Sequence, residues 1–154
     1  MRKIVGILVL LFFILSTIHI PAQTFSLGQL KSFNALSMAD FKKEMKKLNY
    51  TFYDKVESSE YSLYQYDSPG YQSKIGKFEF TTTKSEDCIE YELPGKKEYE
   101  QYLKLILKEG YKEAEKGKII TKEPYVDYYK NKDHIRMVLP KKGETAPYII
   151  MVFR

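Results

Sequence analysis

The sequence predicts an α+β fold of two tandem repeats, each with one main helix packed on an antiparallel sheet of about four strands, and the two sheets are expected to join side by side. Two segments repeat apolar residues at helical spacing, and the segments that follow them alternate apolar and polar residues. The chain also matches itself at an offset of 61 residues, which aligns Phe41 with Tyr102 and Asn49 with Gly110. We therefore expect a signal peptide at residues 1–23, a first repeat at 24–95 and a second repeat at 96–154.

The N-terminal segment has the pattern of a secretory signal peptide. Arg2 and Lys3 precede an apolar run over residues 4–20, and Pro21-Ala22-Gln23 follows it. The pattern predicts cleavage at the end of this segment and therefore a secreted or periplasmic protein. An uncleaved membrane anchor is the alternative, because about 20 apolar residues are enough to span a bilayer. Membrane contact is expected only through that segment.

The chain is mildly basic. Its 154 residues carry a net charge of +5 at pH 7, which falls to +3 without Arg2 and Lys3. Nucleic-acid binding requires a dense basic patch on one side of a protein, so no nucleic-acid partner is expected. The lysines of the predicted helices stand among acidic residues, and we interpret them as a solvated face.

In the first repeat, a helix is predicted over residues 38–48. Ser37 stands three residues before Asp40, close to a capping box, and Phe41 begins an apolar stripe at helical spacing. Residues 24–36 are expected to start extended and then form one helical turn. Strands are predicted over residues 50–56, 61–66, 74–83 and 87–93.

Three glutamates of this repeat alternate with apolar residues. Because alternate residues of a strand point to one face, Glu79, Glu90 and Glu92 are expected to share the solvated face of the sheet. Two carboxyl groups roughly 5–10 Å apart can hydrolyse a glycosidic bond, so a cell-envelope hydrolase is an alternative function. We favour the simpler interpretation, a solvated strand face.

In the second repeat, a helix is predicted over residues 97–109. Tyr99, Tyr102 and Ile106 form its apolar stripe, and Gly110 is a natural C-terminal stop. Strands are predicted over residues 111–114, 118–121, 125–129, 134–139 and 148–153.

This order of elements resembles the secreted β-lactamase inhibitor proteins, which pair two helix-plus-four-strand repeats and grip an enzyme with the open face of the joined sheet. The resemblance covers most of the mature chain and lies in element order only. It implies a non-catalytic inhibitor of a protein partner. Members of that family carry internal disulfides, which a chain with Cys88 as its single cysteine cannot form. No binding residue is therefore transferred from the family.

Cys88 and His134 are the cysteine and the histidine that remain after residue 23. A catalytic thiol needs a base within hydrogen-bond reach, and no flanking signature supports such a pair. We interpret the two as unrelated residues of the solvated sheet face. One thiol and one imidazole also fall short of the four or so ligands of a structural zinc site. We predict no catalytic residue, no metal site and no cofactor.

Tyrosine is in excess, with 14 residues, most of them on predicted strands. Tyrosine is enriched at recognition surfaces, although it also favours strands for their own sake. Together with charged residues of the sheet face, the tyrosines predict a partner-binding surface. The candidate binding residues are Tyr64, Tyr66, Glu79, Glu90, Glu92, Tyr128, His134 and Arg136.

We expect a non-catalytic binding protein that acts outside the cytoplasm. A protein partner would dock on the sheet face that no helix covers, as an inhibitor or immunity protein binds a secreted enzyme or toxin. A small-ligand or glycan-binding module, whose tyrosines would line a pocket between the repeats, is a second alternative beside the hydrolase.

Overall fold

The structure is a computed structural model that describes residues 24–82 and 85–154. The predicted signal peptide and its cleavage point lie outside the described residues. Within the described ranges, no helix is long and apolar enough to cross a membrane.

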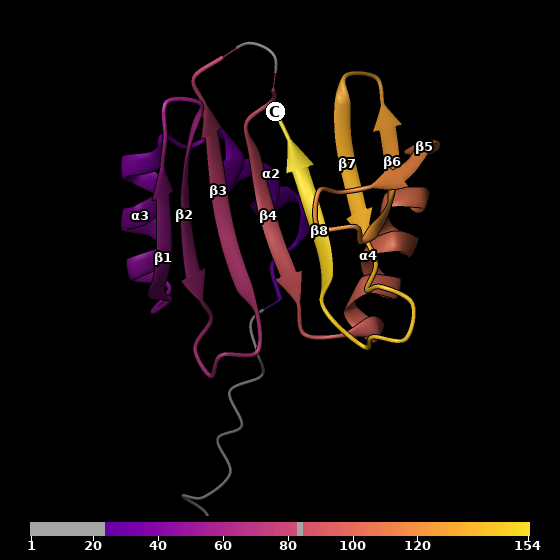
Figure 1. The fold of residues 1–154 in the computed structure, drawn as a ribbon, viewed down its shortest axis with the longest axis horizontal. Helices are drawn as coiled ribbons and strands as arrows, with labels where there is room; N and C mark the ends of the chain where they lie inside the picture. Colours follow the sequence, from indigo (N-terminus) through magenta and orange to yellow (C-terminus); the bar gives the residue numbers. More distant parts are fainter. Residues whose placement is uncertain (1–23, 83–84) are drawn as a thin grey trace, which may run out of the picture.

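One antiparallel sheet of eight strands forms the body of the protein, in the order β1-β2-β3-β4-β8-β7-β6-β5 (Figure 1). The strands are β1 (Thr51–Glu57), β2 (Tyr61–Asp67), β3 (Lys74–Phe80), β4 (Cys88–Leu93), β5 (Lys112–Lys118), β6 (Pro124–Lys130), β7 (Asp133–Val138) and β8 (Tyr148–Phe153). The antiparallel pairing predicted from the alternation is confirmed. β4 and β8 pair from Cys88 with Phe153 to Leu93 with Tyr148, which joins both halves of the chain in one sheet.

The predicted fold class, two repeats that each hold one main helix on a sheet of about four strands, is wrong. The structure has a single eight-stranded sheet and three short helices, and the strands contain more of the described residues than the helices do. The physical reason is that β4 and β8 satisfy each other's backbone N–H and C=O groups, and that one core packs all three helices on the resulting sheet. The described residues therefore do not divide into two separate helix-on-sheet units. The resemblance to the β-lactamase inhibitor proteins depended on the two-repeat order and carries no further argument.

The three helices are α2 (Leu27–Ala35), α3 (Met38–Lys47) and α4 (Lys96–Lys108). Ser26 and Ser37 begin the first two, because their hydroxyls accept hydrogen bonds from the backbone N–H groups of Gln29 and Asp40. α4 begins after Gly95 without a side-chain cap. The two helices predicted from periodicity correspond to α3 and α4, whereas α2 is longer than the single turn expected.

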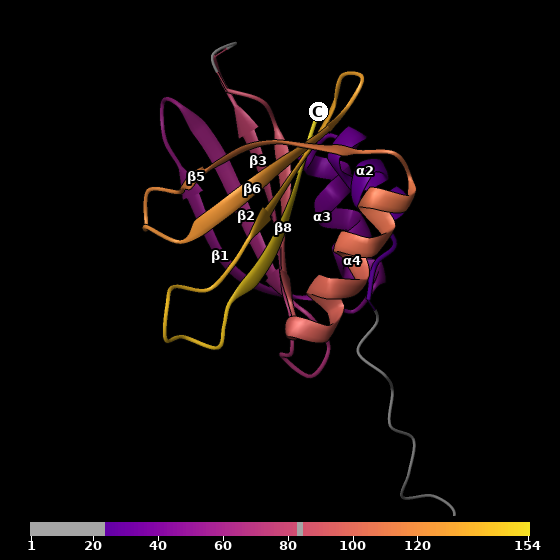
Figure 2. The same cartoon turned by 90° about the vertical axis from the view of Figure 1, so that its right-hand side faces the viewer.

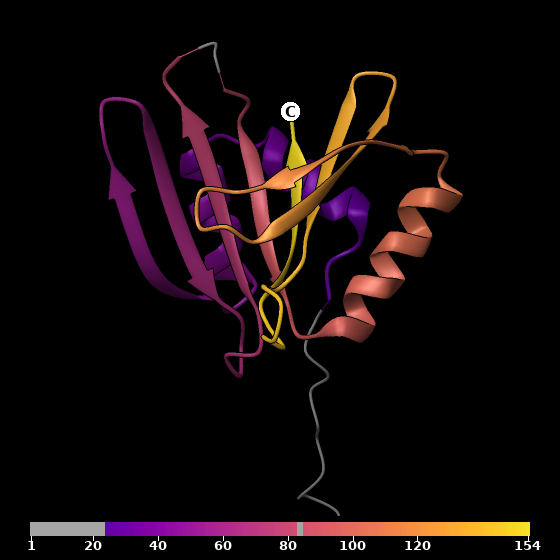
Figure 3. The same ribbon diagram turned by 45° about the vertical axis from the view of Figure 1, so that its right-hand side comes forward.

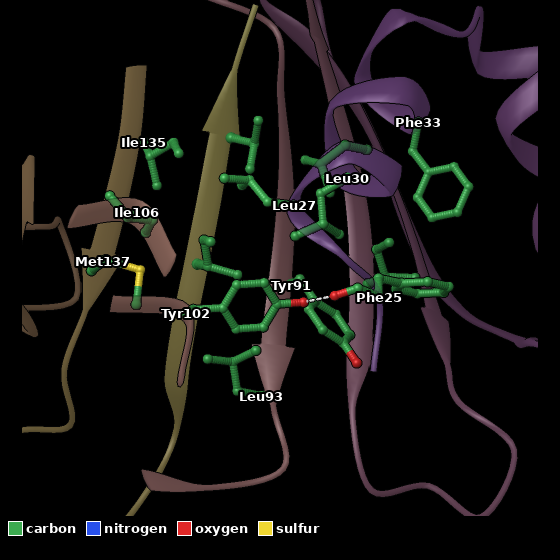
Figure 4. Packing of buried hydrophobic residues seen from close by; sticks show 14 of the residues in the cluster. Phe25, Leu27, Leu30, Phe33, Tyr91, Leu93, Tyr102, Ile106, Ile135 and Met137 are labelled. Atoms are coloured by element: carbon green, nitrogen blue, oxygen red, sulfur yellow. Dashed lines mark hydrogen bonds between the residues drawn. The ribbon is translucent and has the colours of Figure 1, made fainter. Parts of the chain in front are cut away.

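All three helices lie on one side of the sheet, and the main core fills the space between them (Figures 1 and 2). α2 and α4 contact β4 and β8, and α3 contacts β3. Figure 4 shows Phe25, Tyr91 and Tyr102 in the core, where the Tyr102 hydroxyl donates a hydrogen bond to the carbonyl of Phe25. Because Phe25 and Tyr102 come from opposite halves of the chain, both halves share this core.

A charged side chain also lies on the helix side. Lys77 of β3 is fully buried, and its Nζ donates a hydrogen bond of 2.9 Å to the carbonyl of Asn34 near the end of α2. Burial lowers the pKa of Lys77. The Glu79 carboxylate, whose Oε1 lies 3.7 Å from Lys77 Nζ, favours the charged form of the lysine. A cation at this place complements the partial negative charge of a helix C-terminus. The contact also shows that Lys77 faces the helices.

The sheet bends so that both of its edges turn away from the helices. Figures 2 and 3 show β1 at one edge and β5 with β6 at the other curving to the same side. The pairing register shifts between Phe52 and Asp54 in β1 and between Glu113 and Glu115 in β5. Such bulges bend a strand and increase its twist. The face without helices therefore lies on the inside of the bend.

Candidate functional site

The candidate site is the side of the sheet opposite the helices, which we call the inner sheet face. Side chains alternate between faces along a strand, so the register determines which residues belong to it. The residues of the inner sheet face are, in part, Val56, Leu63, Lys74, Phe78, Cys88, Glu90, Glu92, Asp127, Tyr129, His134, Arg136, Met151 and Phe153. None of these positions faces a helix.

An aromatic row begins on β2 and β3. Tyr61, Phe78 and Phe80 pack ring against ring, with centroids 5.7 to 6.1 Å apart. Cys88 on β4 continues the row, because it pairs with Phe78 on one side and with Phe153 on the other. The row thus crosses the middle of the sheet on uncharged side chains.

A stack of three rings on β8, β7 and β6 completes the aromatic row. His134 lies between Tyr129 and Phe153, whose centroids are 4.4 and 4.0 Å from its own ring, with planes only 8° and 10° apart. The His134 side chain is 9% exposed, although no helix covers it. The neighbouring rings therefore hold both its position and its plane.

A polar cluster adjoins this stack. Arg136 donates two hydrogen bonds of 2.8 Å to the buried carboxylate of Asp127, and its guanidinium lies 3.6 Å from the ring centroid of Tyr125. His134 Nε2 is 3.1 Å from Asp127 Oδ1 without hydrogen-bond geometry, and Nδ1 is 3.4 Å from Glu86. Burial opposes ionisation of Asp127, but the Arg136 hydrogen bonds and charge outweigh it and hold the pKa of Asp127 below its ordinary value.

Two glutamates occupy the middle of the inner sheet face. Glu90 and Glu92 project from β4, where they pair with Gly76 and Lys74 of β3. Among the described residues, neither carboxylate forms a hydrogen bond or an ion pair. Burial, with a contribution from the charge of Glu92, raises the pKa of Glu90 to about 7. The centre of the face therefore holds a half-buried acid that lacks a partner.

Cys88 and His134 share the inner sheet face but do not form a dyad. Phe153 of β8 lies between them, since it pairs with Cys88 and stacks on His134. Burial raises the pKa of the Cys88 thiol far above its ordinary value, and the charges of Glu90 and Asp87 add to the effect. A buried, protonated thiol is a poor nucleophile.

The eight candidate binding residues divide between the two sides of the sheet. Those on the inner sheet face are Glu90, Glu92, His134 and Arg136. Those on the helix side are Tyr64, Tyr66, Glu79 and Tyr128. Tyr66 and Tyr128 belong to the core itself. Glu79 lies on the opposite face from Glu90, so the expectation that the three glutamates share one face is wrong.

The misplacement of Glu79 has a physical cause. Apolar residues of a strand are expected to face the core, which would direct Phe78 and Phe80 toward the helices. In the structure Ile75 and Lys77 point there instead. The inside of the bend packs aromatic rings of its own, so both faces of β3 carry apolar residues. The alternation of apolar and polar residues in β3 therefore could not predict that Phe78 lies on the inner sheet face.

A cavity of about 220 Å³ lies at one end of the sheet, where α2 meets the β6–β7 turn and the end of β8. Its lining includes Lys31, Asn34, Asp133, His134 and Arg154. No tyrosine lines it, so it is not the pocket expected for a glycan-binding module. In the part of the chain that the structure describes, no group of three or more His, Cys, Asp or Glu residues is placed to hold a metal ion.

Comparison of the chain with protein-family models, with curated proteins and with solved structures gives no match. The class of protein is therefore defined by geometry: a bent eight-stranded antiparallel sheet with helices on its outer side.

Proposed function

We propose that the protein binds a protein partner through the inner sheet face, outside the cytoplasm, and that binding rather than catalysis is its function. The observation that carries this proposal is the aromatic row across the side of the sheet that no helix covers. The signal-peptide pattern of residues 1–23 supports a partner outside the cytoplasm. An inhibitor or immunity protein is the concrete form of this function.

The row has the dimensions of a protein interface. With Val56 on β1 at one end and Tyr129 on β6 at the other, it spans six strand spacings of about 4.8 Å, or roughly 29 Å along the sheet. An interface of standard size covers about 800 Å² of each partner, which is a patch of similar width. Both end residues are 39% exposed and therefore open to a partner.

The curvature of the sheet restricts the shape of that partner. The row lies on the inside of the bend, and β1 and the β5–β6 hairpin rise on either side of it (Figure 3). A flat surface would touch only the two edges and leave the row uncovered. We therefore infer a partner that presents a convex surface or a protruding loop.

One observation favours a second candidate, a hydrolase. Glu90, with its pKa raised to about 7, could act as a general acid, while Glu92 on the same face acts as the second carboxylate. This candidate predicts turnover of cell-envelope glycan that Glu90→Gln abolishes. Binding of a partner without turnover of any glycan would count against it.

The binding proposal is tested by two charge substitutions on opposite sides of the sheet. Val56→Asp places a charge at an exposed end of the row, and Leu107→Asp does the same to a 51% exposed leucine of α4. The immobilised full chain and both variants are incubated with secreted and envelope proteins of the source cells. Each captured protein is then purified and titrated against all three chains.

We expect a protein that binds saturably, keeps its affinity for the Leu107→Asp variant and binds the Val56→Asp variant about tenfold or more weakly. The reason is that a partner covering the end of the row would have to bury the new carboxylate without a counter-charge. A protein that binds both variants equally would place the interface elsewhere. The absence of any saturable partner would contradict the proposal.

A further inference from the structure

Glu90 lies at the centre of the inner sheet face, and its direct cross-strand partners are neutral. β4 has three strands on one side of it and four on the other, and Glu90 pairs with Gly76 on β3 and Met151 on β8. Leu63 and Gln65 close over Gly76, each within 3.2 Å of the place that a Cβ would take. None of these groups carries a charge that could balance the carboxylate.

The two basic side chains of the same region make their close contacts with other groups. Lys74 Nζ lies 3.4 Å from the ring centroid of Tyr53. Arg136 holds both oxygens of Asp127 at 2.8 Å. No ion pair among the described residues reaches Glu90, and burying a carboxylate without a partner is unfavourable. Lys74 pairs with Glu92 across the strands and lowers the pKa of Glu90, but it forms no ion pair with the Glu90 carboxylate. The fold therefore leaves Glu90 without an ion-pair partner.

We propose that the partner inserts a basic side chain, an arginine or a lysine, which pairs with Glu90 and Glu92. This inference rests on the proposed function and adds the chemistry of the partner. Two carboxylates on one face of a strand offer several acceptor oxygens to a guanidinium or an ammonium group. Phe78 and Phe153 stand diagonally from Glu90 on the neighbouring strands, where an aromatic ring can also attract a cation.

The pH dependence of binding gives this proposal a signature. Burial and Glu92 raise the pKa of Glu90 to about 7, and Lys74 opposes them. The titratable or charged groups around it are Lys74 on β3, Cys88 and Glu92 on β4 and, beyond β8, Arg136 on β7. A basic side chain binds the ionised form of Glu90. The affinity should therefore rise about tenfold between pH 6 and pH 8.

The test uses two capped peptides, Gly-Gly-Arg-Gly-Gly and Gly-Gly-Gln-Gly-Gly, which differ only in charge and side-chain shape at the centre. Each is titrated at pH 6 and pH 8 into the ¹⁵N-labelled full chain, and the backbone amide shifts are followed. Glu90→Gln removes the charge at nearly constant volume. Glu109→Gln changes an exposed glutamate at the end of α4, on the other side of the sheet, and is the matched control.

We expect the arginine peptide to shift the amides of Gly76, Glu90 and Met151 saturably, about tenfold more weakly at pH 6. The shifts should vanish in Glu90→Gln and persist in Glu109→Gln, and the glutamine peptide should cause none. An equal response to both peptides, an unchanged response of Glu90→Gln or no response at millimolar arginine peptide would overturn the inference. A partner that is sensitive to Val56→Asp but not to Glu90→Gln would overturn it while leaving the proposed function intact.

Discussion

The Glu90 side chain costs stability in the protein without its partner. Its pKa of about 7 lies above the value of about 4.3 for an unfolded glutamate, so the folded chain holds this proton more tightly. The contribution of this proton to the free energy of unfolding is fully present below the pKa of Glu90 in the unfolded chain. It is lost as the pH rises through the pKa of Glu90 in the folded chain. The loss amounts to at most about 4 kcal/mol at pH 8.

Glu90→Gln should therefore be more stable than the unaltered chain at pH 8, by up to about 4 kcal/mol, and nearly equal to it at pH 4. Urea unfolding of both chains at pH 4, 6 and 8 measures the difference. Glu109→Gln provides the baseline for loss of a carboxylate that is exposed. If the gain is the same at pH 4 and pH 8, burial of the charge is not its cause.

Single residues also show how far strand alternation predicts a face. In β4, Tyr91 is fully buried toward the helices and Glu90 lies on the other side, as the alternation suggests. In β3 the same pattern fails, because Phe78 finds aromatic neighbours on the inner sheet face. Tyr66 also misleads, since its ring packs against Phe41 in the core although tyrosine is typical of binding surfaces.

At the scale of the element, helix starts depend on single hydroxyl groups. Ser37 accepts a hydrogen bond from the N–H of Asp40 at 3.2 Å and so begins α3. Ser37→Ala should lower the free energy of unfolding by about 1 kcal/mol, because an N–H of the first turn loses its partner. Chemical denaturation of both chains measures this change in the free energy of unfolding.

Ser32→Ala is the control for this substitution. Ser32 lies inside α2, and its hydroxyl only donates back to the carbonyl of Gly28, so its removal should change stability by much less. Equal effects of the two substitutions would mean that the cap of α3 contributes nothing beyond a serine hydroxyl in any helix.

The sequence predicts elements well where a period is long enough to be recognised. α3 and α4 have clear apolar stripes, and both are predicted within about one residue at each end. α2 also had a signal, since Ser26 and Gln29 form a capping box, but apolar spacing alone suggested only one turn. β5 is predicted as two short pieces, because its residues Lys112–Lys118 are poor strand formers and depend on pairing with β6.

At the scale of the whole molecule, the continuous sheet and the shared core make the two halves interdependent. β4 and β8 pair along their full lengths, and Phe25 and Tyr102 meet in one core. We expect a single cooperative unfolding transition, because neither half can open without exposing the apolar surface of the other. Near-ultraviolet and far-ultraviolet circular dichroism during urea unfolding should give coincident curves. Two separate transitions would mean that the halves are stable alone.

The arrangement of the whole sheet could not be predicted from local patterns. The sequence match at an offset of 61 residues relates the two halves to each other but says nothing of which strands pair between them. That depends on partners such as Cys88 and Phe153, which are far apart in the chain. The bend of the sheet and the aromatic lining of its inner side depend on the same distant pairs.

The central place of β8 also determines when the molecule can be completed during synthesis. Residues 148–153 bridge β4 and β7, although the ribosome adds them after every other described strand. Until they emerge, the nascent polypeptide carries β4 as a bare edge that can pair with foreign strands. A chain interrupted before residue 148 would lack the bridge altogether, and we expect proteases and chaperones to recognise it as unfinished.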